Sequence, residues 1–151
     1  MSGLPMYELT TKSESDQNWV WDKIRKKWLV LTPEEHVRQC LVEYLTREKA
    51  VPAGLISQER GLNYDRRRKR YDLVVFNRLG KPTLACECKA PYVALDRNAA
   101  LQLAVYNREL QASLLIWTNG QRLLVYRAEP GKSLQELPEL PNFDLWSEGL
   151  V

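Results

Sequence analysis

The sequence has few of the side chains on which many simple catalytic and metal centres depend. Its 151 residues include one histidine, His36, and three cysteines, Cys40, Cys86 and Cys88. A zinc site built on Cys86 and Cys88 would need two further ligands, and only one histidine exists. His36 has no second base or nucleophile at a spacing typical of a triad hydrolase. The odd cysteine count fits reduced, buried thiols better than a disulfide framework.

Long apolar runs and glycine-rich phosphate loops are also missing. No apolar run approaches the ~20 residues of a membrane span, and residues 1–16 have neither the basic start nor the apolar core of a secretion signal. We therefore expect a cytoplasmic protein with no membrane partner. Without a glycine-rich phosphate loop, we expect no ATP site in this chain. With 44% hydrophobic and 27% charged residues, the chain suits one domain with a real core.

Positive charge is concentrated in one short run. The formal net charge is +3, and the run supplies five positive charges, so the rest of the chain is slightly acidic. It lies just before Asp72, where a phosphate backbone could approach a carboxylate cluster. The alternative is a solvated loop that only aids solubility. The run consists of Arg66, Arg67, Arg68, Lys69 and Arg70.

Hydrophobic periodicity and turn residues predict an α+β sandwich with a mixed sheet. We expect an N-terminal arm at residues 1–18, a domain at 19–128, and a proline-containing acidic tail at 129–151 packed on the same domain. Thr32 and Pro33 are typical of a helix start. The expected helices cover residues 33–48 and 98–111, and the expected strands cover residues 19–21, 28–31, 55–62, 71–76, 83–90, 113–118 and 123–126.

Two neighbouring strands carry the residues that suggest chemistry. Asp72 is a lone aspartate among apolar residues, where a carboxylate is costly unless it is paired or ligated. Glu87 and Lys89 lie two residues apart, so they share one face of a strand. If the two strands pair as a hairpin, Asp72 reaches the same face, and the three groups suit a hard divalent cation beside a phosphodiester. The alternative is a metal-free ion pair of Asp72 with Arg70 or Lys89.

The order of Asp72 and then Glu87-Cys88-Lys89 resembles the PD-(D/E)xK nuclease superfamily. Further blocks make the resemblance narrower, and together they are similar to the N-terminal domain of type I restriction enzyme R subunits from about Trp19 to Tyr126. This resemblance implies a restriction-endonuclease-like mixed sheet flanked by helices, in an α/β/α-like sandwich. The further blocks are Leu31–Gln39, Arg70–Asp72, Gln102–Asn107 and Trp117–Gly120.

The resemblance also implies roles at the metal. Asp72 and Glu87 would hold Mg²⁺, with Mn²⁺ able to substitute, because all the ligands are hard oxygens. The backbone carbonyl of Cys88 would join them, and Lys89 would hold the attacking water. Glu35 would reach the metal directly or through water. Its spacing from Thr32 also spells a capping box, in which Glu35 bonds back to the Thr32 backbone.

A second pair of residues is implicated in DNA contact. Gln102 and Tyr106 lie four residues apart and share a helix face. A Gln-x-x-x-Tyr motif follows the Glu-x-Lys strand in RecB-like nucleases, where it lies beside the active site. The resemblance therefore implies that both residues contact DNA, together with residues 66–70. The alternative is an ordinary surface glutamine and a half-buried tyrosine.

The function implied is a Mg²⁺-dependent (endo)deoxyribonuclease that hydrolyses DNA phosphodiester bonds, encoded by a prokaryote or a phage. The alternative is a non-catalytic nucleic-acid-binding or assembly module of a restriction-type complex. Implied partners are DNA and other restriction-complex subunits. A complete R subunit also uses an ATP-driven motor, so we expect no DNA translocation by this chain alone. Trp19, Trp21 and Trp28 suit a homodimer interface as well as a core.

Overall fold

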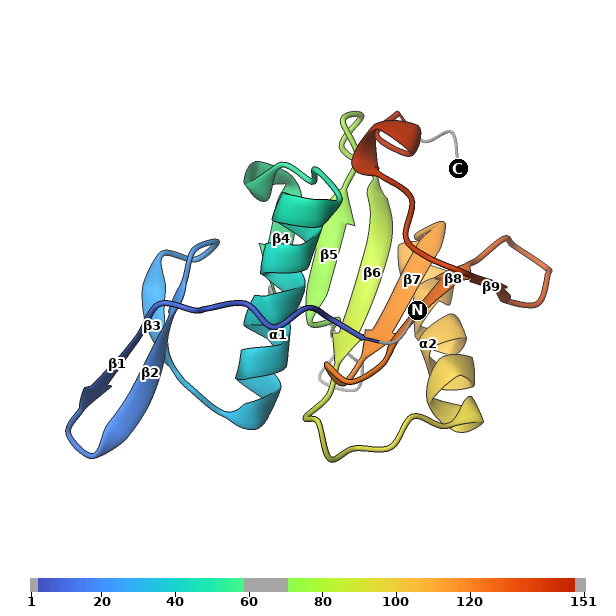
Figure 1. Ribbon diagram of the computed structural model, residues 1–151. Coiled ribbons are helices and arrows are strands. Elements are labelled where there is room, and N and C mark those ends of the chain that lie inside the picture. Colours follow the sequence, from blue (N-terminus) through green and yellow to red (C-terminus); the bar gives the residue numbers. More distant parts are fainter. Residues whose placement is uncertain (1–2, 59–70, 149–151) are drawn as a thin grey trace.

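The computed structural model describes residues 3–58 and 71–148. The basic run at residues 66–70 lies outside these ranges. The described chain contains two α-helices, α1 (Pro33–Glu43) and α2 (Arg97–Leu110), and two β-sheets (Figure 1). The strands are β1 (Thr11–Glu14), β2 (Gln17–Asp22), β3 (Lys27–Val30), β4 (Ile56–Gln58), β5 (Leu73–Phe76), β6 (Pro82–Cys88), β7 (Leu114–Thr118), β8 (Leu123–Arg127) and β9 (Gln135–Leu137).

The larger sheet is mixed, as the sequence predicts. Its six strands follow the order β4-β5-β6-β7-β8-β9, and only β6 and β7 are parallel among the described strands. A parallel neighbour requires a crossover, and α2 supplies it between β6 and β7. The other connections are antiparallel, including the predicted hairpin of β5 and β6. The α+β class is therefore confirmed.

The two helices cover opposite faces of this sheet. Because side chains alternate along a strand, β6 contributes residues to the cores on both faces. Leu84, Cys86 and Cys88 of β6 pack in the same core as Val37 and Leu41 of α1. Ala85 of β6 and Trp117 of β7 pack with Leu103 of α2. The arrangement is a helix–sheet–helix sandwich. Neither α-helix in the described ranges combines the length and apolar character that a membrane crossing requires.

Helix α1 begins where the sequence predicts. Thr32 is the N-cap, and its hydroxyl accepts a hydrogen bond from Glu35 N–H at 3.0 Å. Pro33 occupies the first turn, where a missing N–H costs no hydrogen bond. After Glu43 the chain continues as a π-helical turn, Tyr44–Glu48. The predicted helix over 33–48 is thus helical throughout, with wider winding in its last turn.

The N-terminal strands form a separate three-stranded antiparallel sheet beside α1 (Figure 1). The predicted hairpin of residues 19–21 and 28–31 is present as β2 and β3. The expected arm at residues 1–18 contains β1, so that segment is partly strand. Asp22 anchors this sheet: it is 0% exposed and accepts hydrogen bonds from Arg25 Nε at 3.0 Å and from Gln58 Nε2 at 3.1 Å.

The C-terminal tail contributes more than a surface wrap. It adds strand β9 to the edge of the large sheet and forms a 3₁₀ turn at Phe143–Leu145. Leu140, Phe143 and Trp146 are buried in the core on the α1 face. The described part of this segment therefore contributes to the core itself. These residues recur every third position, but the segment contains Pro138 and Pro141 and only a short 3₁₀ turn, so no amphipathic helix marks them in the sequence.

Candidate functional site

The candidate site lies where β5 begins and β6 ends. Asp72 immediately precedes β5, and its N–H donates to the Cys86 carbonyl at 3.0 Å. Glu87 lies in β6, and Lys89 follows the end of that strand. Lys89 N–H continues the ladder by donating to the Thr118 carbonyl of β7 at 2.9 Å. Pairing of β5 with β6 therefore brings the three predicted residues to one end of the sheet.

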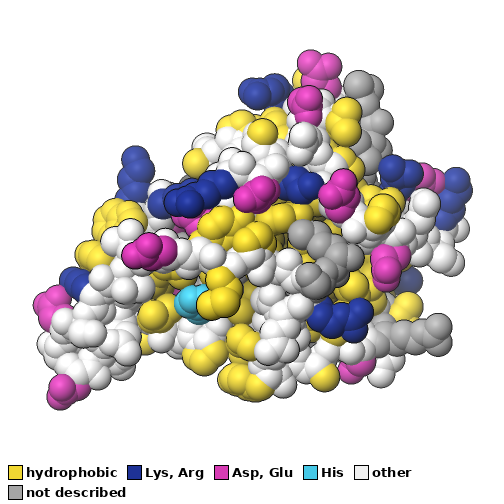
Figure 2. Space-filling model, viewed as in Figure 1, with side chains coloured by type: hydrophobic (Ala, Val, Ile, Leu, Met, Phe, Trp, Pro, Cys, Tyr) yellow, Lys and Arg dark blue, Asp and Glu magenta, His cyan; other side chains and the backbone are white. Residues whose placement is uncertain are grey.

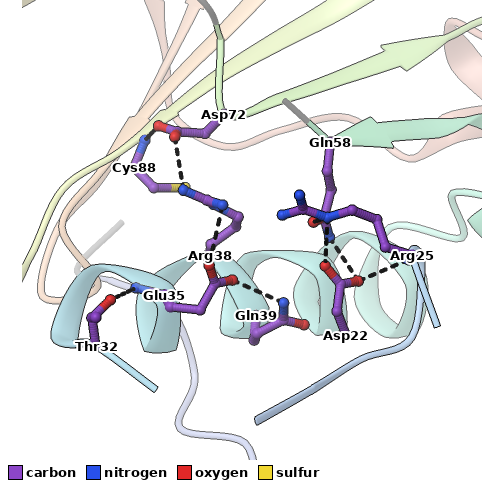
Figure 3. Close-up of polar contacts among 9 residues, drawn as sticks. All are labelled: Asp22, Arg25, Thr32, Glu35, Arg38, Gln39, Gln58, Asp72 and Cys88. Carbon is purple, nitrogen blue, oxygen red and sulfur yellow. Dashed lines mark hydrogen bonds and ion pairs between the residues drawn. The ribbon is translucent and has the colours of Figure 1, made fainter. Parts of the chain in front are cut away.

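The Asp72 carboxylate is buried and held by two donors. One oxygen accepts from Cys88 N–H at 2.7 Å, and the other forms an ion pair with Arg38 Nη2 of α1 at 3.1 Å (Figure 3). The residue before it, Tyr71, donates through its hydroxyl to the Leu103 carbonyl of α2 at 3.3 Å. Asp72 thus turns toward α1, whereas Tyr71 turns toward α2. The described ion pair of Asp72 is with Arg38, a partner that we did not predict.

Burial dominates the electrostatics of Asp72. It raises the pKa of Asp72 from an ordinary 3.8 to about 6, and the negative charges of Glu87 and Glu34 add to the rise. The hydrogen bond from Cys88 N–H and the charge of Arg38 lower the pKa but do not outweigh burial. A carboxyl group whose pKa is raised by burial and by nearby charges is found in functional sites and in buried ion networks alike.

Glu87 and Lys89 form the neighbouring pair that their spacing predicts. Lys89 Nζ lies 3.2 Å from Glu87 Oε1, and Glu87 is 5% exposed. Strand alternation places Glu87 on the α2 face with Ala85, and its register partner is Trp117. Partial burial lowers the pKa of Lys89, but attraction to Glu87 outweighs it and the pKa is raised overall. Lys89 therefore remains an ammonium beside this carboxylate.

The Glu35 side chain binds neither of the groups that its two expected roles require. Its carboxylate forms an ion pair with Arg38 Nη1 at 3.1 Å and accepts from Gln39 Nε2 at 3.0 Å (Figure 3). Only half of the capping box is present: Thr32 caps Glu35 N–H, but Thr32 N–H donates to the Val30 carbonyl at 3.1 Å, and the Glu35 carboxylate contacts Arg38 and Gln39. Burial raises the pKa of Glu35. Arg38 thus bridges Glu35 and Asp72 in one buried network.

The Gln102 and Tyr106 pair lies on α2. Gln102 is exposed and Tyr106 is half-buried. Burial, with the charges of Glu87 and then Tyr106, raises the pKa of Tyr71. Tyr106 is therefore close enough to influence the residue next to Asp72. Gln102 faces solvent one helical turn before Tyr106.

Three residues of this region were missed in the sequence. Arg38 was hidden within the apolar stripe of a helix, although its spacing of three from Glu35 is typical of a helical ion pair. The negative charge of Glu34 contributes to the raised pKa values of both Asp72 and Lys89. Tyr71 connects the site to α2, but an aromatic residue at a strand start is common and gave no separate signal.

Comparison with known protein families identifies the family of this chain. Residues 33–141 match the model of the type I restriction enzyme R protein N terminus (HSDR_N). That span covers more than half of the chain, from the first residue of α1 to just before the 3₁₀ turn at Phe143–Leu145. The chain belongs to the HSDR_N family. No curated protein and no solved structure matches it.

Membership of the HSDR_N family supports a restriction-type role. The matched span includes Asp72, Glu87 and Lys89 and both α-helices. It leaves out β1, β2 and β3, so the three-stranded sheet lies outside the HSDR_N match. Within the described ranges, no three acidic, histidine or cysteine side chains are grouped closely enough to form a metal-binding set by themselves.

Proposed function

We propose that this HSDR_N protein is a metal-dependent nuclease that hydrolyses phosphodiester bonds of DNA. The observation that carries the proposal is the pair of buried carboxylates, Asp72 and Glu87, at adjoining strand ends beside the ammonium of Lys89. Each carboxylate is costly to bury as an anion, and the charge of Glu87 raises the pKa of Asp72. A divalent cation between them would offset both costs.

The donor chemistry fits Mg²⁺. This ion is commonly bound by one or two carboxylates, substrate phosphates and several waters, without a cage of protein ligands. Asp72 and Glu87 would hold it, with the Cys88 carbonyl as a further oxygen donor and Glu34 or Glu35 as candidates through water. When bound, the cation would polarise the phosphoryl oxygen and lower the pKa of a water. Mn²⁺ satisfies the same oxygen donors.

The proposal also gives roles to the remaining predicted residues. Lys89, an ammonium beside Glu87, would hold the attacking water and neutralise charge that develops on the phosphate. Gln102 and Tyr106 of α2 would contact the bound strand. Residues 66–70, which precede Asp72 in the chain, would supply sequence-independent phosphate contacts.

The test is cleavage of labelled single-stranded DNA, double-stranded DNA and RNA with Mg²⁺, Mn²⁺ or chelator. We expect metal-dependent cutting of DNA that is lost in Asp72→Asn and in Lys89→Ala. Asn is chosen because it can still accept the hydrogen bond from Cys88 N–H. Matched controls are Asp144→Asn and Lys81→Ala, both at exposed positions. Retained cutting in either site variant would refute the assignment.

One observation favours a second function. Both Asp72 oxygens already have protein partners, Arg38 and Cys88 N–H, without a metal ion. A non-catalytic module that binds nucleic acid or assembles a restriction complex would need nothing more. Such a module would bind nucleic acid with a strong salt dependence and release no products with any metal. Added Mg²⁺ should stabilise a nuclease against unfolding and leave its Asp72→Asn variant unchanged, whereas it should stabilise neither form of the module.

A further inference from the structure

The outer face of the three-stranded sheet carries an unusual group of tryptophans. The register pairs Trp19 with Val30 and Trp21 with Trp28, so all four side chains share one face. Val20 and Asp22 alternate with them, are 0% exposed, and face the body of the protein. Trp21 is 36% exposed and Val30 is 41% exposed. None of the four side chains on the outer face belongs to either hydrophobic core of the described chain.

The aromatic rings of this face contact one another, and a lysine lies over one of them. Trp21 and Trp28 meet edge to face, with ring centroids 5.4 Å apart. Lys12 of β1 lies over the Trp28 ring, with its Nζ 4.6 Å from the ring centroid, and pairs with Glu14 at 2.9 Å. Beside them is a hollow of about 220 Å³ lined by Lys12, Glu14, Ser15, Trp19 and Trp28.

Charge at the end of this sheet favours an anionic partner. The segment from Asp22 to Lys27 contains four cations and one acid, Asp22, which is neutralised by Arg25. Lys26 and Lys27 are exposed. In the space-filling view, Lys and Arg side chains gather over the β2–β3 turn and the adjoining part of α1, with acidic groups among them (Figure 2). Lys23 is paired with Glu43 there, which leaves Lys26 and Lys27 as the exposed cations of the turn.

We propose that this face, defined by Lys12, Trp19, Trp21 and Trp28, binds unpaired bases of single-stranded nucleic acid, an inference that rests on the nuclease function proposed above. Sequence-tolerant binders of single strands combine aromatic rings, on which bases stack, with cations that follow the phosphates. Here the indoles supply the stacking surface, Lys12 supplies a cation on the same face, and Lys26 supplies one at the β2–β3 turn. Lys27 pairs in register with Asp22 and therefore lies on the opposite face. A protein partner could also bind the tryptophans, but it would not require aromatic rings and cations together.

The connection to the candidate site is short and rigid. Strand β3 ends at Val30 and α1 begins at Pro33. The first turns of α1 carry Glu35 and Arg38, and Arg38 contacts Asp72. The sheet is also tied to β4 through Asp22 and Gln58. A single strand stacked on the tryptophans would therefore be held in a fixed relation to Asp72. The base-binding face itself lies outside the HSDR_N match, next to the matched helix α1.

The experiment measures binding of a fluorescent 20-nucleotide oligothymidine to the full chain in chelator, where no cleavage occurs. We expect Trp21→Ala to weaken binding roughly 5- to 150-fold, the effect of losing one base–aromatic stack. Trp21→Phe should restore most of the affinity. An abasic oligonucleotide of the same length should bind wild type weakly and respond little to Trp21→Ala. Lys12→Gln should lower the dependence of log affinity on log salt by about 0.7.

Leu79→Ala is the matched control, because Leu79 is 65% exposed in the turn between β5 and β6, away from the tryptophans. Thermal unfolding should show that each variant remains folded. Equal affinity of wild type and Trp21→Ala for oligothymidine would overturn the proposal. So would a dimer of wild type that Trp21→Ala converts to monomer with unchanged oligonucleotide affinity, since the face would then bind a second copy. If Trp21→Ala cleaves DNA and binds oligothymidine like wild type, the binding face is refuted and the nuclease proposal is retained. If binding depends on the tryptophans but no cleavage occurs, the nuclease proposal is refuted and the binding face is retained.

Discussion

Asp72→Asn should make the protein more stable at neutral pH while abolishing cleavage. Burial raises the pKa of Asp72 from 3.8 to about 6, and each unit of pKa corresponds to about 1.4 kcal/mol between the two protonation states. The ionised carboxylate therefore costs about 3 kcal/mol in the folded protein at pH 7.5. Asn has the same shape without the charge, so the variant should gain about that much.

The sign of the pH dependence follows from proton binding. Between pH 3.8 and about 6 the folded protein holds a proton on Asp72 that the unfolded chain has released. Stability of wild type relative to Asp72→Asn therefore falls as pH rises through this window. The stabilisation by Asp72→Asn should be about 3 kcal/mol at pH 7.5 and about half as large at pH 5.

Urea unfolding followed by tryptophan fluorescence, in chelator at pH 5 and pH 7.5, measures both values. The exposed control Asp144→Asn should change stability by less than about 0.5 kcal/mol. If Asp72→Asn were less stable than wild type at pH 7.5 with an unchanged denaturant slope, the ion pair with Arg38 would outweigh burial, and the reasoning would be refuted.

Two further substitutions test the network and the fold. Arg38→Met leaves Glu35 and Asp72 buried without their shared cation, so urea unfolding should show a loss of stability of about 3–5 kcal/mol. The control is Arg47→Met, because the Arg47 side chain is 61% exposed. Equal small losses of stability in both variants would show that the Arg38 ion pairs add little. Gly120→Ala should destabilise by about 1–3 kcal/mol, because Gly120 has φ +88° and an added Cβ would lie 3.2 Å from Val37 Cγ2. Gly54→Ala, with open space around it, is its thermal-unfolding control, and matching midpoints would contradict the expected strain.

The central strands and both helices were predictable because local sequence and burial agree there. Asp96 and Thr32 cap helices that begin at or within a residue of the expected positions. The expected strands at 113–118 and 123–126 are joined by a four-residue loop, residues 119–122, because Thr118 pairs with Leu123. Asn119 side-chain oxygen accepts from Gln121 N–H and Arg122 N–H, which closes this four-residue loop.

Strands β1 and β9 were missed for a common reason. Their sequences, Thr11–Glu14 and Gln135–Leu137, are mostly polar and mostly exposed. Such strands are stabilised by hydrogen bonds to a neighbour, and hydrophobic alternation does not mark them. The neighbour, β2 or β8, has the apolar pattern and determines where each edge strand can pair. Their existence is a property of the sheet and not of their own residues.

The direction of the Asp72 side chain is the least predictable part of the site. Strict alternation would place Asp72 on the face opposite Leu73. Yet Leu73 packs in the core on the α1 face, and Asp72 also reaches α1 through Arg38. The alternation fails because Asp72 precedes β5 and finds two donors on that side, Arg38 and Cys88 N–H. A cation that binds Asp72 together with Glu87 must therefore compete with Arg38, so the strength of that one ion pair controls how readily the proposed metal site forms.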